Sequence, residues 1–240
     1  MSDLQERAKR HLMLHFSDMT LEASEIPVLV RGDGCYFFDD AGNRLIDGRS
    51  GLYCTNLGLS HGEEIGAAAA AQMATLPFTT NWTTAHPPSI DLATKLAELA
   101  PDGFERTFFT SGGSEAVESA YKLARQWHTA NGEPERKKVI ARRDAYHGTS
   151  LGALSFTGIP VCRTAFEPMA VETAHVANTN AYRHPAGGEE AGFTKALLEE
   201  IESVIEFERP ETIAMIIMEP VQNAGGSITP PAGYWDGLRE

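Results

Sequence analysis

A glycine-rich turn at residues 110–116 is the first segment whose residue types suit ligand chemistry. It reads TSGGSEA and lies between a short apolar run and a helical pattern. Glycine lets the backbone approach a ligand closely, and the free N–H groups at the positive end of a helix dipole favour a phosphate. Gly112, Gly113 and Ser114 are therefore candidate phosphate-binding residues. A plain helix cap is the alternative explanation, and the spacing fits neither the P-loop nor the dinucleotide fingerprint.

Two further candidates follow apolar strand patterns. Tyr146, in YHG at 146–148, comes just after the expected strand 138–141, and an aromatic ring at the carboxyl edge of a sheet can stack on a planar ligand. Glu219, in MEPVQ at 218–222, ends a very apolar run, and the proline after it prevents regular strand pairing. A packed surface tyrosine and a solvated strand end are the alternatives.

A different chemistry is suggested by residues 148–152, which read GTSLG and fit the G-x-S-x-G pattern of serine hydrolases. His175 and His184 follow it in the chain. In a hydrolase the serine should lie on a tight turn directly after the strand. Ser150 is displaced past YHG, and no clear oxyanion-loop motif precedes it, so a serine hydrolase acting through Ser150 is the weaker interpretation.

Two patterns of elements position these residues. Residues 4–16 indicate a helix, and three short apolar runs between 28 and 47, separated by glycine-rich turns, indicate an antiparallel meander. After residue 60, helical patterns alternate with apolar strands. Helices are expected at 63–76, 89–99, 114–130, 194–206 and 235–240, and strands at 106–110, 138–141 and 213–218.

This alternation predicts an α/β fold, namely a three-layer αβα domain with a mainly parallel sheet. We expect two domains. Residues 1–59 form an N-terminal segment with a helix and the meander, and residues 60–240 form the first part of the larger, ligand-binding domain. In the helix 114–130 the apolar stripe consists of Ala116, Ala120, Leu123, Ala124 and Trp127.

Composition excludes some classes of function. The formal net charge is −13 and no basic block exceeds a few residues, so nucleic acid is not an expected partner. The cysteine count is three, with no CxxC pair, so neither a disulfide framework nor a metal site is expected. No apolar stretch has the length of a signal peptide or a membrane span. We expect a cytoplasmic protein without a membrane partner.

The ordered set of motifs resembles the class III aminotransferases, which are fold-type I enzymes that use pyridoxal 5′-phosphate (PLP). The likeness spans nearly the whole chain. It rests on GDGCYFFD at 32–39 with DG at 47–48, SHG at 60–62, FTSGGSEA at 109–116, YHG at 146–148 and EPVQ at 219–222. The ω-aminotransferase branch is similar at LYC 52–54, LPF 76–78 and YRHP 182–185.

The resemblance implies roles for the candidate residues. Gly112, Gly113 and Ser114 would hold the PLP phosphate, although the family often has serine where this chain has Gly112. Tyr146 would stack on the pyridine ring, and Glu219 would lie near it. The aromatic residues Phe16, Tyr53 and Trp82 match positions that line the amine pocket of the ω branch; ordinary packing is the alternative for all three. The implied reaction moves an amino group from a primary amine or ω-amino acid to a 2-oxo acid such as pyruvate, in a homodimer.

The resemblance also implies an incomplete site. In the family, an aspartate pairs with the pyridine nitrogen and a lysine forms the Schiff base, and both lie downstream of the Glu-Pro motif. The lysines of this chain are Lys9, Lys95, Lys122, Lys137, Lys138 and Lys195, and none occupies a family-like position. We therefore expect that the chain is truncated before that lysine and that these 240 residues alone are inactive. A catalytically dead fragment, a PLP-fold binding module, an aminomutase and a decarboxylase stay as alternatives.

Overall fold

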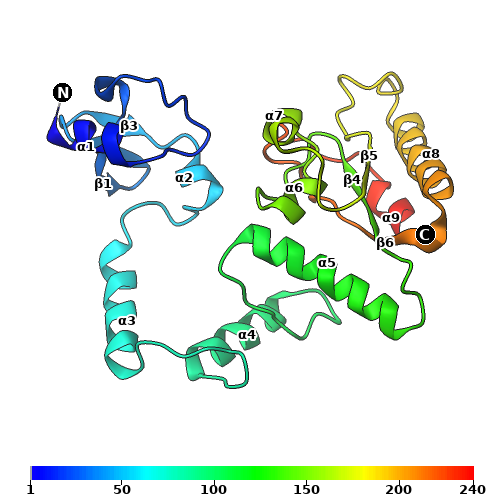
Figure 1. Ribbon diagram of the computed structural model, residues 1–240, viewed down its shortest axis with the longest axis horizontal. Coiled ribbons are helices and arrows are strands. Elements are labelled where there is room, and N and C mark those ends of the chain that lie inside the picture. Colours follow the sequence, from blue (N-terminus) through cyan, green and yellow to red (C-terminus); the bar gives the residue numbers. More distant parts are fainter. Residues whose placement is uncertain (1) are drawn as a thin grey trace. The chain divides into compact units, whose positions relative to one another are not determined.

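The computed structural model describes residues 2–240 and divides them into two compact units. One unit runs up to Glu105, and the other is Arg106–Glu240 (Figure 1). The two domains expected from the sequence, 1–59 and 60–240, were defined as parts of a longer protein. Their boundary stays a prediction.

The first unit is built on the expected helix and meander. Helix α1 (Asp3–His11) begins at a capping box formed by Ser2 and Gln5. Strands β1 (Leu29–Asp33), β2 (Tyr36–Asp39) and β3 (Arg44–Ile46) form an antiparallel sheet in the order β1-β2-β3. The helix was expected to reach residue 16 but ends at His11, because the backbone of Leu12 is extended (φ −109°, ψ 122°) and does not continue the helix. The basic residues of its last turn suit the negative end of the helix dipole.

The other helices of the first unit follow the meander. They are the short η1 (Ala23–Glu25) and α2 (Ser50–Tyr53), and the longer α3 (Gly62–Thr75) and α4 (Pro87–Leu99). The last two confirm the helices expected at 63–76 and 89–99. Helix α4 begins two residues earlier than expected because it starts with two prolines, whose fixed φ suits the first turn of a helix.

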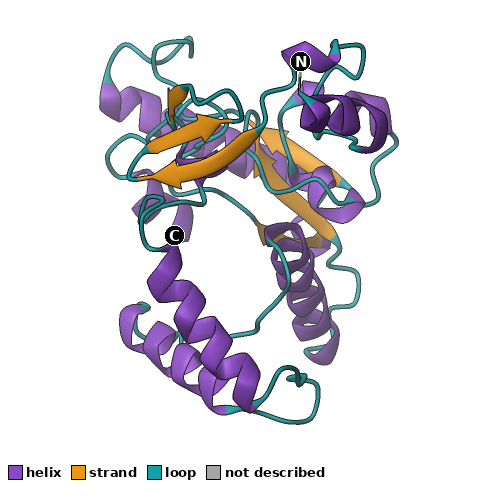
Figure 2. Cartoon of the chain, turned by 90° about the vertical axis from the view of Figure 1, so that its left-hand side faces the viewer, coloured by secondary structure: helices purple, strands orange, loops and turns teal. Residues whose placement is uncertain are grey.

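The second unit contains a parallel sheet in the order β5-β4-β6. The strands of the chain are orange in Figure 2. Its strands are β4 (Lys138–Arg142), β5 (Thr173–Val176) and β6 (Ile213–Ile216). In the central strand, Ile140 pairs with Ala174 of β5 and with Ile216 of β6. The expected α/β fold with parallel strands is confirmed.

The side chains of β4 alternate between two apolar layers, as the period of a strand requires. Ile140 packs with Leu197 and Ile201 of α8 (Glu190–Glu208). Val139 and Ala141 pack on the other face, against Phe156 of α6 (Leu151–Phe156) and Val117 of α5 (Gly113–Ala130). Helices α5 and α8 therefore cover opposite faces of the sheet (Figure 1).

Short helices complete this unit. They are α7 (Pro160–Arg163), η2 (Thr164–Phe166), η3 (Pro210–Thr212) and α9 (Tyr234–Arg239). Within residues 2–240, no helix has the length and apolar content needed to cross a membrane.

The structure corrects two further expectations. Residues 106–110 form no strand, because no described strand exchanges backbone hydrogen bonds with them. The apolar stripe of α5 is largely exposed, as Leu123 and Trp127 show. The face of α5 that contacts the sheet core contains Val117 and Tyr121 instead.

Candidate active site

The glycine-rich turn forms the start of α5, as the sequence predicts. Gly112 is the N-cap, and within residues 2–240 the amides of Gly113 and Ser114 have no hydrogen-bond acceptor. A Cβ atom added at Gly112 or Gly113 would meet nothing within 4 Å, so no described atom crowds the backbone at these two glycines. Free donors at the positive end of an 18-residue helix suit an anion such as a phosphate group.

A loop that follows β4 is bound to this helix start. The amide of Thr149 donates to Ser114 Oγ at 3.1 Å, so this hydroxyl acts as an acceptor toward the loop and keeps its own hydrogen free to donate. Gly148, in this loop, has φ +124°, and a Cβ atom there would collide with Ser114 Oγ. Only glycine allows both this conformation and this close approach.

Glu219 joins the same loop from the segment after β6. The amide of Tyr146 donates to Glu219 Oε2 at 3.0 Å, and the amide of Asn223 donates to Glu219 Oε1 at 3.2 Å. The side chain of Tyr146 is 40% exposed, which leaves its ring available to a ligand. The structure therefore brings together Ser114, Tyr146 and Glu219, three candidates from distant parts of the sequence, at the carboxyl edge of the parallel sheet.

Arg142, the last residue of β4, is a buried cation behind these loops. It is fully buried, and its Nη2 donates to the carbonyl oxygen of Glu219. Its guanidinium lies 5.8 Å and 5.6 Å from the ring centroids of Tyr234 and Trp235, and no carboxylate of the described residues forms a salt bridge with it. Burial lowers the pKa of Arg142 from its usual value. The sequence signal that could have identified it is a charged residue directly after the apolar run 139–141.

His147 is held as a neutral side chain next to Tyr146. Burial, with smaller contributions from Arg142 and His175, lowers the pKa of His147 to about 4. The amide of His147 donates to Thr157 Oγ1 at 2.9 Å, and that hydroxyl donates to the carbonyl of Gly148 at 3.0 Å. These bonds fix the backbone immediately after the tyrosine.

The three aromatic residues assigned to an amine pocket lie in the first unit. Phe16, Tyr53 and Trp82 are 78%, 50% and 91% exposed, and none of them joins an aromatic pair in the described part of the chain. Phe16 and Tyr53 have φ values of 50° and 66°. A left-handed backbone is costly for a bulky side chain and concentrates at functional sites. Their assignment to the pocket stays a prediction.

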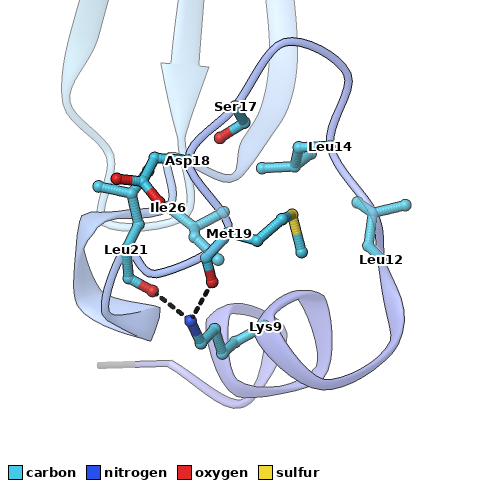
Figure 3. Close-up of a pocket in the computed structure, with 8 residues that line it drawn as sticks. All are labelled: Lys9, Leu12, Leu14, Ser17, Asp18, Met19, Leu21 and Ile26. Carbon is cyan, nitrogen blue, oxygen red and sulfur yellow. Dashed lines mark hydrogen bonds between the residues drawn. The ribbon is translucent and has the colours of Figure 1, made fainter. Parts of the chain in front are cut away.

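Five of the six lysines have oxygen partners. Lys9 Nζ donates to the carbonyls of Met19 and Leu21 at 2.7 and 2.6 Å in a small pocket of the first unit (Figure 3). The other four pair with carboxylates, in the pairs Lys95–Glu98, Lys137–Glu135, Lys138–Glu172, Lys138–Glu208 and Lys195–Glu199. The ammonium groups of these five lysines are therefore engaged in contacts with oxygen atoms of the chain itself.

The hydroxyl of Ser150, the residue of the hydrolase-like pattern, donates to Glu118 Oε1 at 2.6 Å. Within residues 2–240 no histidine forms a hydrogen bond with it. Activation of a serine nucleophile requires an adjacent base such as histidine. This geometry gives no support to a hydrolase.

Known proteins are similar to this chain in sequence and in fold. The profile of the family "Aminotransferase class-III" matches residues 21–240. A probable aminotransferase of Mycobacterium tuberculosis is 45% identical over 231 residues, covering 96% of this chain and 49% of that protein. The putrescine–pyruvate aminotransferase of Pseudomonas aeruginosa is 33% identical, covering 98% and 52%.

A solved structure shows the same likeness. The crystal structure of the omega transaminase from Pseudomonas jessenii in complex with PMP superposes with a TM-score of 0.93 and is 36% identical. The match covers 99% of this chain and 53% of that one, so the chain spans about half the length of these relatives. With a family profile that matches all but its first 20 residues, the chain belongs to the class III aminotransferases.

Proposed function

We propose that the protein containing this chain is a PLP-dependent ω-aminotransferase of the fold-type I class. It moves an amino group from a primary amine or ω-amino acid to a 2-oxo acid, with pyruvate as the acceptor. The observation that carries the proposal is the pair of hydrogen bonds that joins the three predicted cofactor-binding segments, from Thr149 to Ser114 and from Tyr146 to Glu219. The putrescine–pyruvate aminotransferase among the relatives supports the choice of acceptor.

The residues present fit a ligand that carries a phosphate and a planar ring. The amides of Gly113 and Ser114, which have no acceptor among the described residues, and the Ser114 hydroxyl supply donors, while Gly112 adds no side chain beside them. Each hydrogen bond to a charged phosphate contributes about 1.5–3 kcal/mol before the cost of association. Tyr146 is 40% exposed, and the Glu219 carboxylate accepts from its backbone amide.

When bound, PLP supplies an electron-withdrawing ring that makes proton removal from the amine carbon possible. This chain's contribution is to bind and orient. The start of α5 would bind the phosphate, the loop after β4 would offer the Tyr146 ring to the planar part of the cofactor, and Glu219 fixes the backbone of that loop through the Tyr146 amide. Phe16, Tyr53 and Trp82 exclude water around the apolar part of the amine in this proposal.

We infer that the complete protein is a homodimer and that the segment 79–88 lies near the partner subunit. This segment ends in two prolines, and Trp82 within it is 91% exposed. Sedimentation of the active protein tests the assembly, because a fully active monomer contradicts it.

The reaction is tested with the complete protein. We expect its cofactor absorption in the visible range to decrease when a primary amine is added, and alanine to form from pyruvate and the amine. A complete protein that loses no absorption with any amine, and forms no alanine, rules out the proposed reaction. A protein that binds PLP without turnover supports the alternative of a PLP-fold binding module.

A further inference from the structure

Glu118, one turn after Ser114 on α5, accepts three hydrogen bonds from the segment that follows Tyr146. The donors are the hydroxyl of Ser150 at 2.6 Å and the amides of Gly152 and Ala153 at 3.0 and 3.2 Å, and all three meet the same atom, Oε1. These bonds, led by the one from Ser150, lower the pKa of Glu118 from its usual value.

This arrangement replaces an ordinary helix cap. Ser150 is the N-cap of α6, a position where a serine oxygen usually accepts from the first amides of its own helix. Here the Ser150 hydroxyl donates instead, and the carboxylate of another helix satisfies the amides of α6. A Cβ atom at Gly152 would lie 2.7 Å from Glu118 Oε1, so the absence of a side chain at Gly152 permits the contact.

Ser114 and Glu118 are four residues apart and therefore share one face of α5. Ser114 accepts from Thr149 while Glu118 accepts from Ser150, Gly152 and Ala153. The segment 149–153 is thus fixed along this face at two points. Tyr146 lies only three residues before Thr149, and the buried bonds of His147 and Gly148 to Thr157 limit the freedom of the chain between them.

We propose that Glu118 is a positioning residue that holds the segment 146–153 against the start of α5, so that the Tyr146 ring and the phosphate donors of Gly113 and Ser114 bind one ligand together. The proposal rests on the proposed function for the identity of that ligand, a phosphate ester with a planar ring. Glu118 touches neither group of the ligand, and it acts through the loop.

The experiment compares Glu118→Ala with Glu118→Gln in the complete protein that contains this chain. Because all three donors meet Oε1, the amide oxygen of glutamine can accept the same bonds, and Glu118→Gln is the conservative rescue. Glu202→Ala is the control. Glu202 is an exposed residue of α8, on the opposite face of the sheet, and forms no ion pair or side-chain hydrogen bond with the described residues.

The first measurement is amide hydrogen exchange. In Glu118→Ala, the amides of Thr149, Gly152 and Ala153 should exchange faster than in the wild type, with little change at β4. Glu118→Gln and Glu202→Ala should retain the wild-type rates. Unchanged exchange in Glu118→Ala overturns the proposal, whatever the protein binds.

The second measurement separates positioning from general stability. Pyridoxamine 5′-phosphate probes the phosphate and ring together, and inorganic phosphate probes the phosphate donors alone. Loss of correct ring stacking in Glu118→Ala should weaken binding of pyridoxamine 5′-phosphate by about three- to tenfold and change inorganic phosphate binding by less than about twofold. Equal losses for both ligands overturn the positioning role. If the complete wild-type protein binds neither ligand, that result counts against the proposed function, and hydrogen exchange alone decides the role of Glu118.

Discussion

The amide of Tyr146 donates a hydrogen bond to Glu219 Oε2 at 3.0 Å, although the two residues are 73 positions apart in the chain. The bond connects the loop after β4 to the segment after β6 at the carboxyl edge of the sheet. Glu219 Oε1 accepts from Asn223, so both carboxylate oxygens are used. Glu219 therefore shapes the loop that carries Tyr146, in addition to any contact with a ligand.

Replacement of Glu219 by alanine should lower the free energy of unfolding by about 1–2 kcal/mol, because two amides lose their acceptors. Glu219→Gln should cost less, since its single oxygen still accepts from one of the two amides. Urea denaturation of both variants and of the control Glu202→Ala provides the measurement. An alanine variant as stable as the control contradicts a structural role for Glu219.

Gly148→Ala tests the close approach of the loop to α5. Gly148 has φ +124°, and a Cβ atom added there would collide with Ser114 Oγ, whereas Gly132 also has a positive φ, +82°, but would place an added Cβ in open space. We expect Gly148→Ala to lower the free energy of unfolding by about 3 kcal/mol and Gly132→Ala by about 1 kcal/mol. Urea denaturation of the two variants measures both effects. Equal effects would mean that backbone strain alone, without the contact to Ser114, explains the glycine at 148.

The elements that the sequence predicted well are those with local signals. The glycine-rich start and the Asn131-Gly132 end of α5 are visible in the sequence, as are the turns of the meander. Strand β5 was missed because its four residues, Thr173–Val176, mix polar with apolar side chains, and it becomes a strand through pairing with β4. The expected strand at 106–110 lacks such a neighbour among the described residues.

Contacts between residues far apart in the chain also explain what was missed at the site. The residue types of the three binding segments were recognisable, but the bonds between them join positions 35 and 73 residues apart. Spacing along one helix could have indicated that Glu118 shares a face with Ser114. It could not have indicated that Ser150 and the start of α6 lie on that face, because only the packing of α6 beside α5 places them there.

His147 predicts how stability depends on pH. Its pKa in the folded protein is lowered to about 4, below the value of 6.5 expected when it is unfolded, so the unfolded chain binds more protons between these values. The stabilisation is complete above about pH 6.5 and is lost as the pH falls toward 4, with a total of about 3 kcal/mol. His147→Gln should show a smaller loss of stability between pH 7 and pH 4 in urea denaturation. The pKa of His175 is also lowered, but its contribution is present in both proteins and cancels in the comparison.

Ser150 should not react with a fluorophosphonate probe. Its hydroxyl donates to Glu118, and a carboxylate that also accepts from two amides is a poor substitute for the histidine of a serine hydrolase. Mass spectrometry after incubation with the probe gives the answer, with an active serine hydrolase as the positive control. Labelling of Ser150 that disappears in heat-denatured protein would revive the hydrolase interpretation.

The last prediction concerns the six lysines of this chain. Five of them already have oxygen partners in the structure, and Lys122 lies on the exposed surface in the middle of α5. A lysine that carries PLP must be a free amine held close to the cofactor. We therefore expect that borohydride reduction of the 240-residue chain with PLP labels no single lysine stoichiometrically, and that alanine formation from pyruvate and an amine does not exceed the rate with free PLP. Stoichiometric labelling of one lysine, together with turnover that its replacement by arginine removes, would show that this chain contains its own catalytic lysine.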